Sequence, residues 1–196
     1  MESLPNQLSN DRILVRKVLT GDQRAFSQII KETEGLVAQI IFKMIANSDD
    51  RKDLAQDVYL KVYQQLDRFR FQAKLSTWIG QIAYHTCLHH LERKKIALVP
   101  IGDSDREPSP GFSTPFENEI EGQLMREELS QLVASAMDQL NPIYRTLITL
   151  YHQEELSYSE IGQIVQLPEG TVKSYLFRAR KALKAHVLRI YNTNIG

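Results

Sequence analysis

The spacing of apolar residues is the feature that most limits what this chain can fold into. Apolar side chains recur every three or four residues along nearly the whole sequence, which is the period of one face of an α-helix. One segment interrupts the pattern, from Ile96 to Gly122, and it contains four prolines. Such a segment cannot bury enough apolar surface to order itself. The sequence therefore predicts an all-α protein with two small domains, 1–95 and 123–196, joined by a flexible acidic linker over 96–122.

Charge is balanced overall but unevenly placed. The chain has 24 Lys and Arg and 24 Asp and Glu. The segment between the two domains is acidic, whereas the stretch from Gly170 to Tyr191 contains six Lys and Arg and no acidic residue. A basic helix in a neutral chain predicts a polyanion-binding site at that helix rather than nucleic-acid binding over the whole surface.

Cysteine content and hydropathy indicate the compartment. Cys87 is the only cysteine, so no intrachain disulfide can form, and a reducing environment is the simplest one for it. The first thirty residues lack the apolar core of a signal peptide, and no apolar run reaches the roughly 18 residues that span a bilayer. We expect a cytoplasmic, soluble protein without stable membrane insertion.

Capping residues predict where the N-terminal helices begin and end. Gly21 ends a first short helix, and Asp22 is placed to cap a second one, in which Gly35 could divide the pattern. A turn and cap at Asn47 precede a third helix, and a fourth is expected from about Ser76 to Lys95.

The C-terminal region contains two capped helices followed by a third. Asn141–Pro142 opens one helix, and Ser157–Glu160 is a capping box for the next. Leu167–Gly170 ends that short helix, and the following helix has a narrow apolar stripe opposite a basic face. This arrangement predicts a helix-turn-helix that binds DNA through its last helix. The alternative is a charged, solvated face on a helix of a bundle.

Three runs in this region, Leu156–Gly162, Leu167–Ser174 and Arg178–Leu183, together resemble region four of the extracytoplasmic-function sigma factors. Tyr175 and Phe177 stand where that family commonly has Arg and His. The resemblance implies recognition of the upstream, minus-thirty-five promoter element. The residues expected at that element are Glu169, Thr171, Lys173, Ser174, Phe177, Arg178, Lys181 and Lys184.

The run Asp53–Tyr63 resembles the sigma region that binds the clamp helices of the largest polymerase subunit. On a helix, its polar residues lie along one side and Leu54, Val58 and Val62 along another. The alternative is a solvated face with pairing between Asp57 and Lys61. The resemblance implies that the contacts with core RNA polymerase are Asp53, Gln56, Asp57, Lys61 and Gln64.

The next segment, from Phe69 to Lys95, resembles the sigma region that opens and reads the downstream, minus-ten element. Opening DNA requires groups that enclose an unpaired base and cations along the exposed strand. We expect base capture in the loop from Phe69 to Ser76, whereas a Trp78 at helical spacing beside Ile79 is more readily explained as core. The residues expected at the minus-ten element are Arg68, Arg70, Phe71, Lys74, His85, His89, Arg93, Lys94 and Lys95.

A cluster of His85, Cys87, His89 and His90 suggests a metal site, because histidines four residues apart share a helix face. A closed zinc site needs further ligands at firm spacing, and none is evident nearby. We therefore expect neither a metal nor a cofactor.

Both regions occur in the order that the family has, with the linker between them. The resemblance implies a transcription initiation factor that directs core RNA polymerase, through its largest and second-largest subunits, to promoter DNA. It also implies control by an anti-sigma protein and no catalysis. An ordinary helix-turn-helix regulator would bind duplex DNA alone, usually as a dimer, and would leave Asp53–Tyr63 unexplained. A helical enzyme lacks a nucleophile–base constellation in this sequence, and a protein-binding adaptor is the third alternative.

Overall fold

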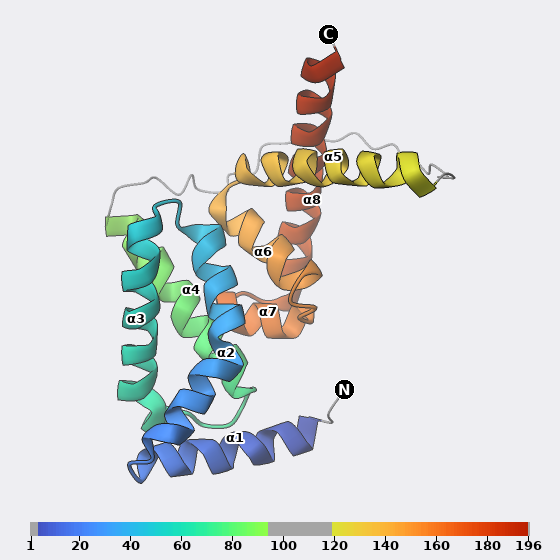
Figure 1. Ribbon diagram of the computed structural model, residues 1–196. Coiled ribbons are helices and arrows are strands. Elements are labelled where there is room, and N and C mark those ends of the chain that lie inside the picture. The colour runs from blue at the N-terminus through green and yellow to red at the C-terminus, as the bar shows by residue number, and fades with distance from the viewer. Residues whose placement is uncertain (1–3, 94–118, 196) are drawn as a thin grey trace.

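The computed structural model describes residues 4–93 and 119–195, and within these ranges all regular structure is helical (Figure 1). The predicted all-α class is therefore confirmed. The N-terminal half contains α1 (Leu4–Leu19), α2 (Gln23–Met44), α3 (Ser48–Gln65), the short 3₁₀ helix η1 (Leu66–Arg68) and α4 (Leu75–Arg93). The C-terminal half contains α5 (Glu119–Asp138), α6 (Pro142–His152), α7 (Tyr158–Val165) and α8 (Glu169–Ile195).

Local capping interactions set the first helix boundaries as the sequence predicts. Gly21 has a φ of 97°, a left-handed conformation that ends α1 at little steric expense. The Asp22 carboxylate then accepts hydrogen bonds from the backbone N–H groups of Arg24 and Ala25, at 2.9 and 3.2 Å. Gly35 does not divide the pattern, because α2 continues through it to Met44.

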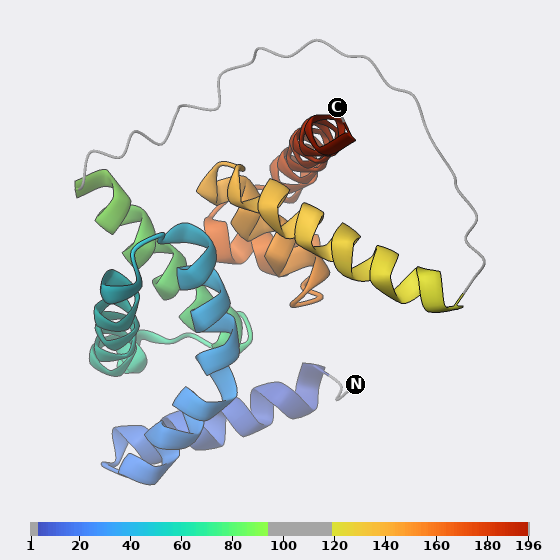
Figure 2. The ribbon, with the colours of Figure 1, turned by 45° about the horizontal axis from the view of Figure 1, so that its top comes forward.

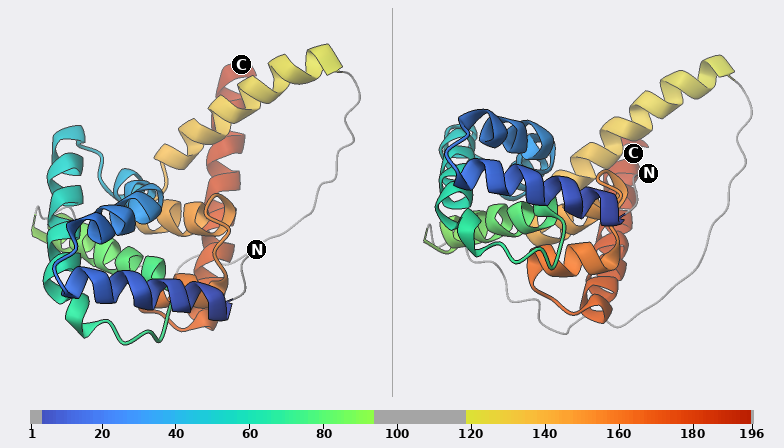
Figure 3. Two further views of the ribbon diagram at one scale, coloured as in Figure 1. Left: turned by 60° about the horizontal axis from the view of Figure 1, so that its bottom comes forward. Right: turned by 90° about the horizontal axis from the view of Figure 1, so that it is seen from below.

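The N-terminal half is a bundle of α2, α3 and α4, and α1 crosses its lower end in the view of Figure 1 (Figures 1 and 3). Asp11 of α1 joins these parts, because its carboxylate accepts a hydrogen bond from the Leu75 backbone N–H at 2.9 Å. This contact satisfies a donor at the start of α4. Burial raises the pKa of the Asp11 carboxyl, and the hydrogen bond from Leu75 opposes that rise.

In the C-terminal half, α8 packs against α5, α6 and α7 and is the longest helix of the described residues (Figure 2). Helix α5 begins at Glu119, inside the segment that the sequence predicts as linker. The remainder of that segment, 96–118, lies outside the described residues.

The two halves also pack against each other, which the sequence analysis did not predict. Helix α4 lies against α7, and α2 lies against α6 (Figures 1 and 2). Buried apolar side chains of both halves, among them Ile40, Ile79, Leu147 and Ile164, belong to one continuous hydrophobic cluster. Each half therefore loses apolar surface to the other as well as to its own helices.

Candidate nucleic-acid and polymerase interfaces

The helix-turn-helix is built from a capped helix and a tight turn. The Ser157 hydroxyl accepts from the Glu160 backbone N–H at 3.2 Å, and the Glu160 carboxylate accepts from the Ser157 N–H at 3.0 Å. This reciprocal pair is the capping box that the sequence predicts. The turn after α7 passes through Gln166 in a left-handed conformation. A side chain at position 162 would lie 2.7 Å from the Leu167 carbonyl oxygen, so the turn requires Gly162.

Helix α8 presents the two faces that its sequence predicts. Val172, Leu176 and Ala179 are fully buried and hold the helix against its half of the molecule. The other face is open to solvent, and Phe177 stands out on it with 62% of its surface exposed. Of the residues predicted at the minus-thirty-five element, all are exposed except Thr171 and Lys181, which are half-buried. The structure therefore leaves most of this predicted set open to solvent on α8.

Contacts within this face orient two of its polar side chains. The Lys173 ammonium lies 2.9 Å from the Glu169 carboxylate, one helical turn away. The Ser174 hydroxyl donates to the Gly170 carbonyl oxygen at 3.0 Å. Glu169, an unusual residue at a polyanion site, therefore positions Lys173 beside the start of the recognition helix.

A pair of stacked tyrosines borders α8, and the sequence analysis missed it. The rings of Tyr151 and Tyr158 are 5.0 Å apart and nearly parallel. Lys173 lies 5.3 Å from the centre of the Tyr158 ring, and Arg180 lies 5.0 Å from that of Tyr151. The sequence did contain one signal for this arrangement: Lys173 and Arg180 are seven residues apart, which places both cations on the same edge of a helix.

The exposed side of α3 carries most of the predicted polymerase contacts. Asp53, Gln56, Asp57 and Gln64 are exposed on it. Lys61 is half-buried, and its ammonium donates to the Thr86 hydroxyl of α4 at 3.0 Å. The structure therefore does not place Lys61 with the other four residues.

The same α3 surface also presents two exposed apolar residues, Leu60 and Tyr63, which were not predicted as part of it from the sequence. Leu60 and Tyr63 are 56% and 55% exposed. Leu60 follows Gln56 by four residues and Asp57 by three, and Tyr63 follows Leu60 by three, which is the spacing of one helix face. The Phe26 ring of α2 meets the Tyr63 ring edge-on at 5.1 Å. This surface is therefore an apolar patch bordered by carboxylates and amides, the composition that suits a protein partner.

The loop between η1 and α4, residues 69–76, is ordered by aromatic packing. Phe69 is buried, and its ring lies 4.7 Å from Phe71 and 5.2 Å from Trp78. Phe71 has a φ of 56°, a left-handed conformation that is unfavourable for a bulky side chain by about 1–2 kcal/mol. The Arg12 guanidinium lies 5.4 Å from the centre of the Phe71 ring. These aromatic and cation–π contacts stabilise the loop in a conformation that is unfavourable for the backbone of Phe71 alone.

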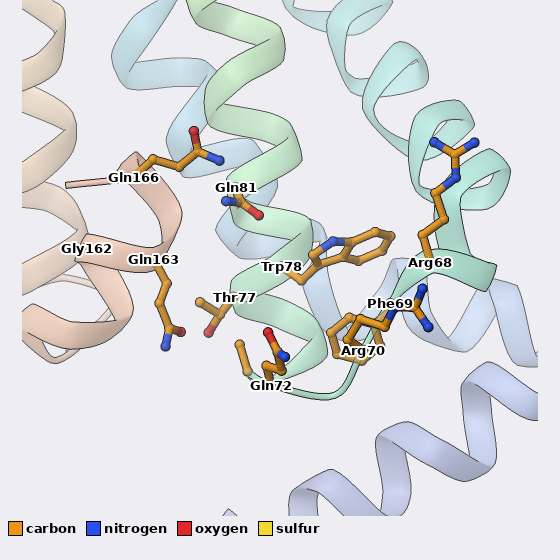
Figure 4. Close-up of a pocket in the computed structure, with 11 residues that line it drawn as sticks. Arg68, Phe69, Arg70, Gln72, Thr77, Trp78, Gln81, Gly162, Gln163 and Gln166 are labelled. Atoms are coloured by element: carbon orange, nitrogen blue, oxygen red, sulfur yellow. The ribbon is translucent and has the colours of Figure 1, made fainter. Parts of the chain in front are cut away.

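A cleft of about 450 Å³ lies beside this loop (Figure 4). Trp78 is half-buried and forms its centre, with Phe69 and the arginines Arg68 and Arg70 on one side. Gln163 and Gln166 of α7 face them from the other side (Figure 4). An aromatic surface with arginines and side-chain amides around it is suited to an unpaired nucleobase and its phosphate.

The other residues predicted at the minus-ten element lie in several environments. His89 and Arg93 are exposed on α4. His85 is half-buried, and its burial together with the nearby His89 lowers its pKa. Lys74 is half-buried in an ion pair with Glu160 of α7, with 2.7 Å between its ammonium and the carboxylate. Lys94 and Lys95 lie outside the described residues.

The cluster of histidines and Cys87 on α4 does not converge on one point. Cys87 is fully buried, and burial raises the pKa of its thiol to about 12. The His90 ring nitrogen lies 3.4 Å from the Asp50 carboxylate of α3. Within 8–93 and 129–192, no three His, Cys, Asp or Glu side chains are grouped as metal ligands would be.

The fold and these surfaces define a helix-turn-helix protein whose N-terminal half has an apolar and acidic patch for a partner. Comparison with known families identifies both halves. Residues 29–96 match the family described as Sigma-70 region 2, and residues 130–183 match Sigma-70, region 4. The ECF RNA polymerase sigma-E factor of Escherichia coli is 33% identical over 177 residues, 88% of this chain and 92% of the relative. The RNA polymerase sigma-H factor of Pseudomonas aeruginosa is 32% identical over 88% and 91% of the two chains.

The chain therefore belongs to the extracytoplasmic-function (ECF) sigma factors, which are transcription initiation factors that direct RNA polymerase to promoters. Solved structures have the same fold. CnrH in complex with the cytosolic domain of CnrY is 24% identical, with a TM-score of 0.62 over 90% of this chain and 96% of that one. The sigma factor RpoE in complex with the anti-sigma factor NepR, from Bartonella quintana, is 19% identical, with a TM-score of 0.59 over 84% and 97%. No helix in the described residues is long and apolar enough to cross a membrane.

Proposed function

We propose that the two halves divide the work of promoter recognition. Loop 69–76 and the basic side of α4 capture and hold the opened minus-ten strand, and the exposed face of α8 reads the minus-thirty-five element as duplex. The protein itself supplies binding and no catalytic step. Because its proposed partner is core RNA polymerase, it would act in the cytoplasm.

The observation that carries this division is the contrast between the two surfaces. The α8 face is a convex, basic helix surface with an exposed Phe177, which suits the major groove of duplex DNA. The cleft at loop 69–76 is concave, and its half-buried Trp78 suits an unpaired base, which duplex DNA cannot offer. An ordinary regulator that binds only duplex DNA has no use for the second surface.

Core polymerase docks, in this proposal, on the α3 surface that contains Asp53, Gln56, Asp57, Leu60 and Tyr63. The apolar pair would supply most of the binding free energy, and the surrounding carboxylates would orient the docking and exclude wrong partners. An anti-sigma protein is a further proposed partner. The support for it is that two solved proteins of this fold are described in complexes, one of them with an anti-sigma factor.

The experiment that tests the docking surface is a charge reversal. Asp57 is exposed on α3, so Asp57→Lys should change the free energy of unfolding by less than about 0.5 kcal/mol. It should lower the affinity for core polymerase at least tenfold, because a buried like-charge contact in the interface is unfavourable by about 1–3 kcal/mol. Glu32→Lys on α2, also exposed, is the matched control and should assemble normally. Normal assembly of a folded Asp57→Lys protein would exclude this surface.

A further inference from the structure

Helix α1 passes beside loop 69–76 and contacts it through two consecutive residues, Asp11 and Arg12 (Figure 3). The match to Sigma-70 region 2 begins at residue 29, so α1 lies outside it. Leu14, Val15 and Val18 are buried and fix α1 to the N-terminal half. This packing holds the two polar residues against the loop.

Asp11 caps the start of α4 from a distant part of the chain. The first intrahelical hydrogen bond of α4 runs from the Trp78 backbone N–H to the Lys74 carbonyl oxygen, so Leu75 is the first residue of the helix. A lysine side chain has no acceptor with which to cap the helix. The Asp11 carboxylate accepts from the Leu75 N–H instead, at 2.9 Å, although the two residues are 64 positions apart.

This cap is shielded from water. Asp11 and Leu75 are only 7% and 4% exposed, so water cannot replace the carboxylate as the acceptor of the Leu75 N–H. A negative charge at the N-terminus of a helix is also stabilised by the helix dipole. The start of α4 therefore depends on α1.

Arg12 contacts the loop four residues earlier, at Phe71. Its guanidinium lies 5.4 Å from the centre of the Phe71 ring, within the range of a cation–π interaction. The backbone of Phe71 is in the left-handed conformation, with a φ of 56°. Helix α1 thus contacts the loop on both sides of residues 72–74, once at an unfavourable backbone conformation and once at a helix start.

Both contacts lead to Trp78, at the centre of the cleft. Trp78 lies three residues after Leu75, in the first turn of the helix that Asp11 caps. The Trp78 ring is also 5.2 Å from the ring of Phe69, which in turn lies 4.7 Å from that of Phe71. The position of the Trp78 ring therefore follows from the conformation of the loop and of the first turn of α4.

We propose that α1 is a positioning element for strand capture. Asp11 and Arg12 hold loop 69–76 in one conformation, which presents Trp78 to an unpaired base before DNA binds. A site that is ordered in advance loses less conformational entropy on binding than one that must order itself. The positioning of Trp78 stands apart from the function proposed for the loop, whereas its effect on strand opening rests on that function.

The first readout is the environment of Trp78, the only tryptophan of the chain. Asp11→Ala removes the acceptor of the Leu75 N–H, so the first turn of α4 should open more often. Acrylamide should then quench Trp78 fluorescence at least about twofold more strongly than in wild type. Asp11→Asn retains a side-chain carbonyl oxygen as acceptor and should be quenched like wild type.

Asn47→Ala is the matched control. The Asn47 side chain accepts from the Asp49 N–H at 2.9 Å and caps α3, at the end of the bundle opposite to α1 (Figure 1). The variant loses a helix cap without touching loop 69–76. It should lower the melting temperature, as the loss of a cap does, and leave the quenching of Trp78 unchanged.

The second readout is strand opening by holoenzyme, on a promoter selected from random-sequence DNA with the wild-type protein. Permanganate should modify the unpaired thymines around the minus-ten element at least about fivefold less with Asp11→Ala than with wild type, and Asp11→Asn should restore the reactivity. Holoenzyme assembly should be unchanged, and so should binding to a duplex that contains only the minus-thirty-five element, because α3 and α8 are not altered.

Unchanged quenching in a folded Asp11→Ala protein would overturn the proposal. So would equal effects of Asp11→Ala and Asp11→Asn, because the hydrogen bond to Leu75 would then not be the cause. If Asp11→Ala does not fold by circular dichroism, Arg12→Ala alters an exposed side chain and must increase the quenching for the proposal to stand. If quenching increases while permanganate reactivity stays at the wild-type level, the positioning stands and the proposed function of loop 69–76 fails.

Discussion

Phe177 offers the clearest test of how α8 reads DNA. A Phe side chain buries roughly 200 Å² when it is covered, and 62% of Phe177 is exposed in the free protein. About 120 Å² is thus available to a partner, which is worth about 3 kcal/mol at 25 cal/mol/Å² if all of it is covered. A base edge in the major groove covers about half, so Phe177→Ala should weaken specific binding by about 1.5 kcal/mol, or roughly tenfold.

The assay uses holoenzyme reconstituted with core polymerase. Selection from duplexes randomised at the minus-thirty-five element first identifies the preferred sequence. Competition binding then compares that duplex with a scrambled one. Phe177→Ala should bind the preferred duplex about tenfold more weakly than wild type, and the scrambled duplex less than about twofold more weakly. The salt dependence should stay unchanged, because no phosphate contact is removed.

Leu188→Ala is the matched control, since Leu188 is 49% exposed further along the same helix. It should leave both affinities unchanged. Lys184→Ala should weaken binding to both duplexes alike and reduce the salt slope by about one unit. An equal loss on the preferred and scrambled duplexes for Phe177→Ala would refute the reasoning, because it would mean that the ring packs on the backbone or supports the fold.

Three further predictions concern the fold itself. Gly162→Ala should lower the free energy of unfolding by about 1–3 kcal/mol in thermal unfolding, because its Cβ would lie 2.7 Å from the Leu167 carbonyl oxygen. Gln166→Gly should raise the free energy of unfolding by about 0.5–1 kcal/mol, because glycine adopts the left-handed conformation without strain. A stabilising Gly162→Ala together with a destabilising Gln166→Gly would contradict this geometry. Cys87, buried and with a pKa of about 12, should react with a thiol reagent at pH 8 only after unfolding by urea, so rapid labelling of native protein would be inconsistent with its position. Burial alone would raise the pKa of Glu160, but the contacts with Lys74 and Ser157 hold it below its ordinary value of 4.5. The stability that these contacts provide is therefore present above pH 4.5 and is lost as pH falls through the lowered pKa. Between about pH 6 and 3.5, the melting temperature of Glu160→Gln should fall less than that of wild type.

Features set by neighbours in sequence could be predicted from the residues alone. The cap at Asp22 and the capping box of Ser157 and Glu160 involve partners two or three residues apart, so the motif contains the whole interaction. The buried stripe of α8 follows from helical periodicity in the same way. The exposed basic face was predictable because it is the complement of that stripe.

Features set by partners distant in sequence could not be predicted. Lys61 has helical spacing with Asp57, yet its ammonium is satisfied by Thr86, 25 residues away. Trp78 was expected in the core from its apolar neighbours, but the aromatic packing of loop 69–76 leaves it half-buried in the lining of the cleft. Periodicity gives the face on which a side chain lies and carries no information on what that face meets.

The packing of the two halves changes how the cations of loop 69–76 should be understood. Lys74 was predicted to contact DNA, whereas in the structure its ammonium is paired with the Glu160 carboxylate of α7. Strand capture would then exchange one anionic partner for another, so the net gain from Lys74 is smaller than that of a solvated lysine.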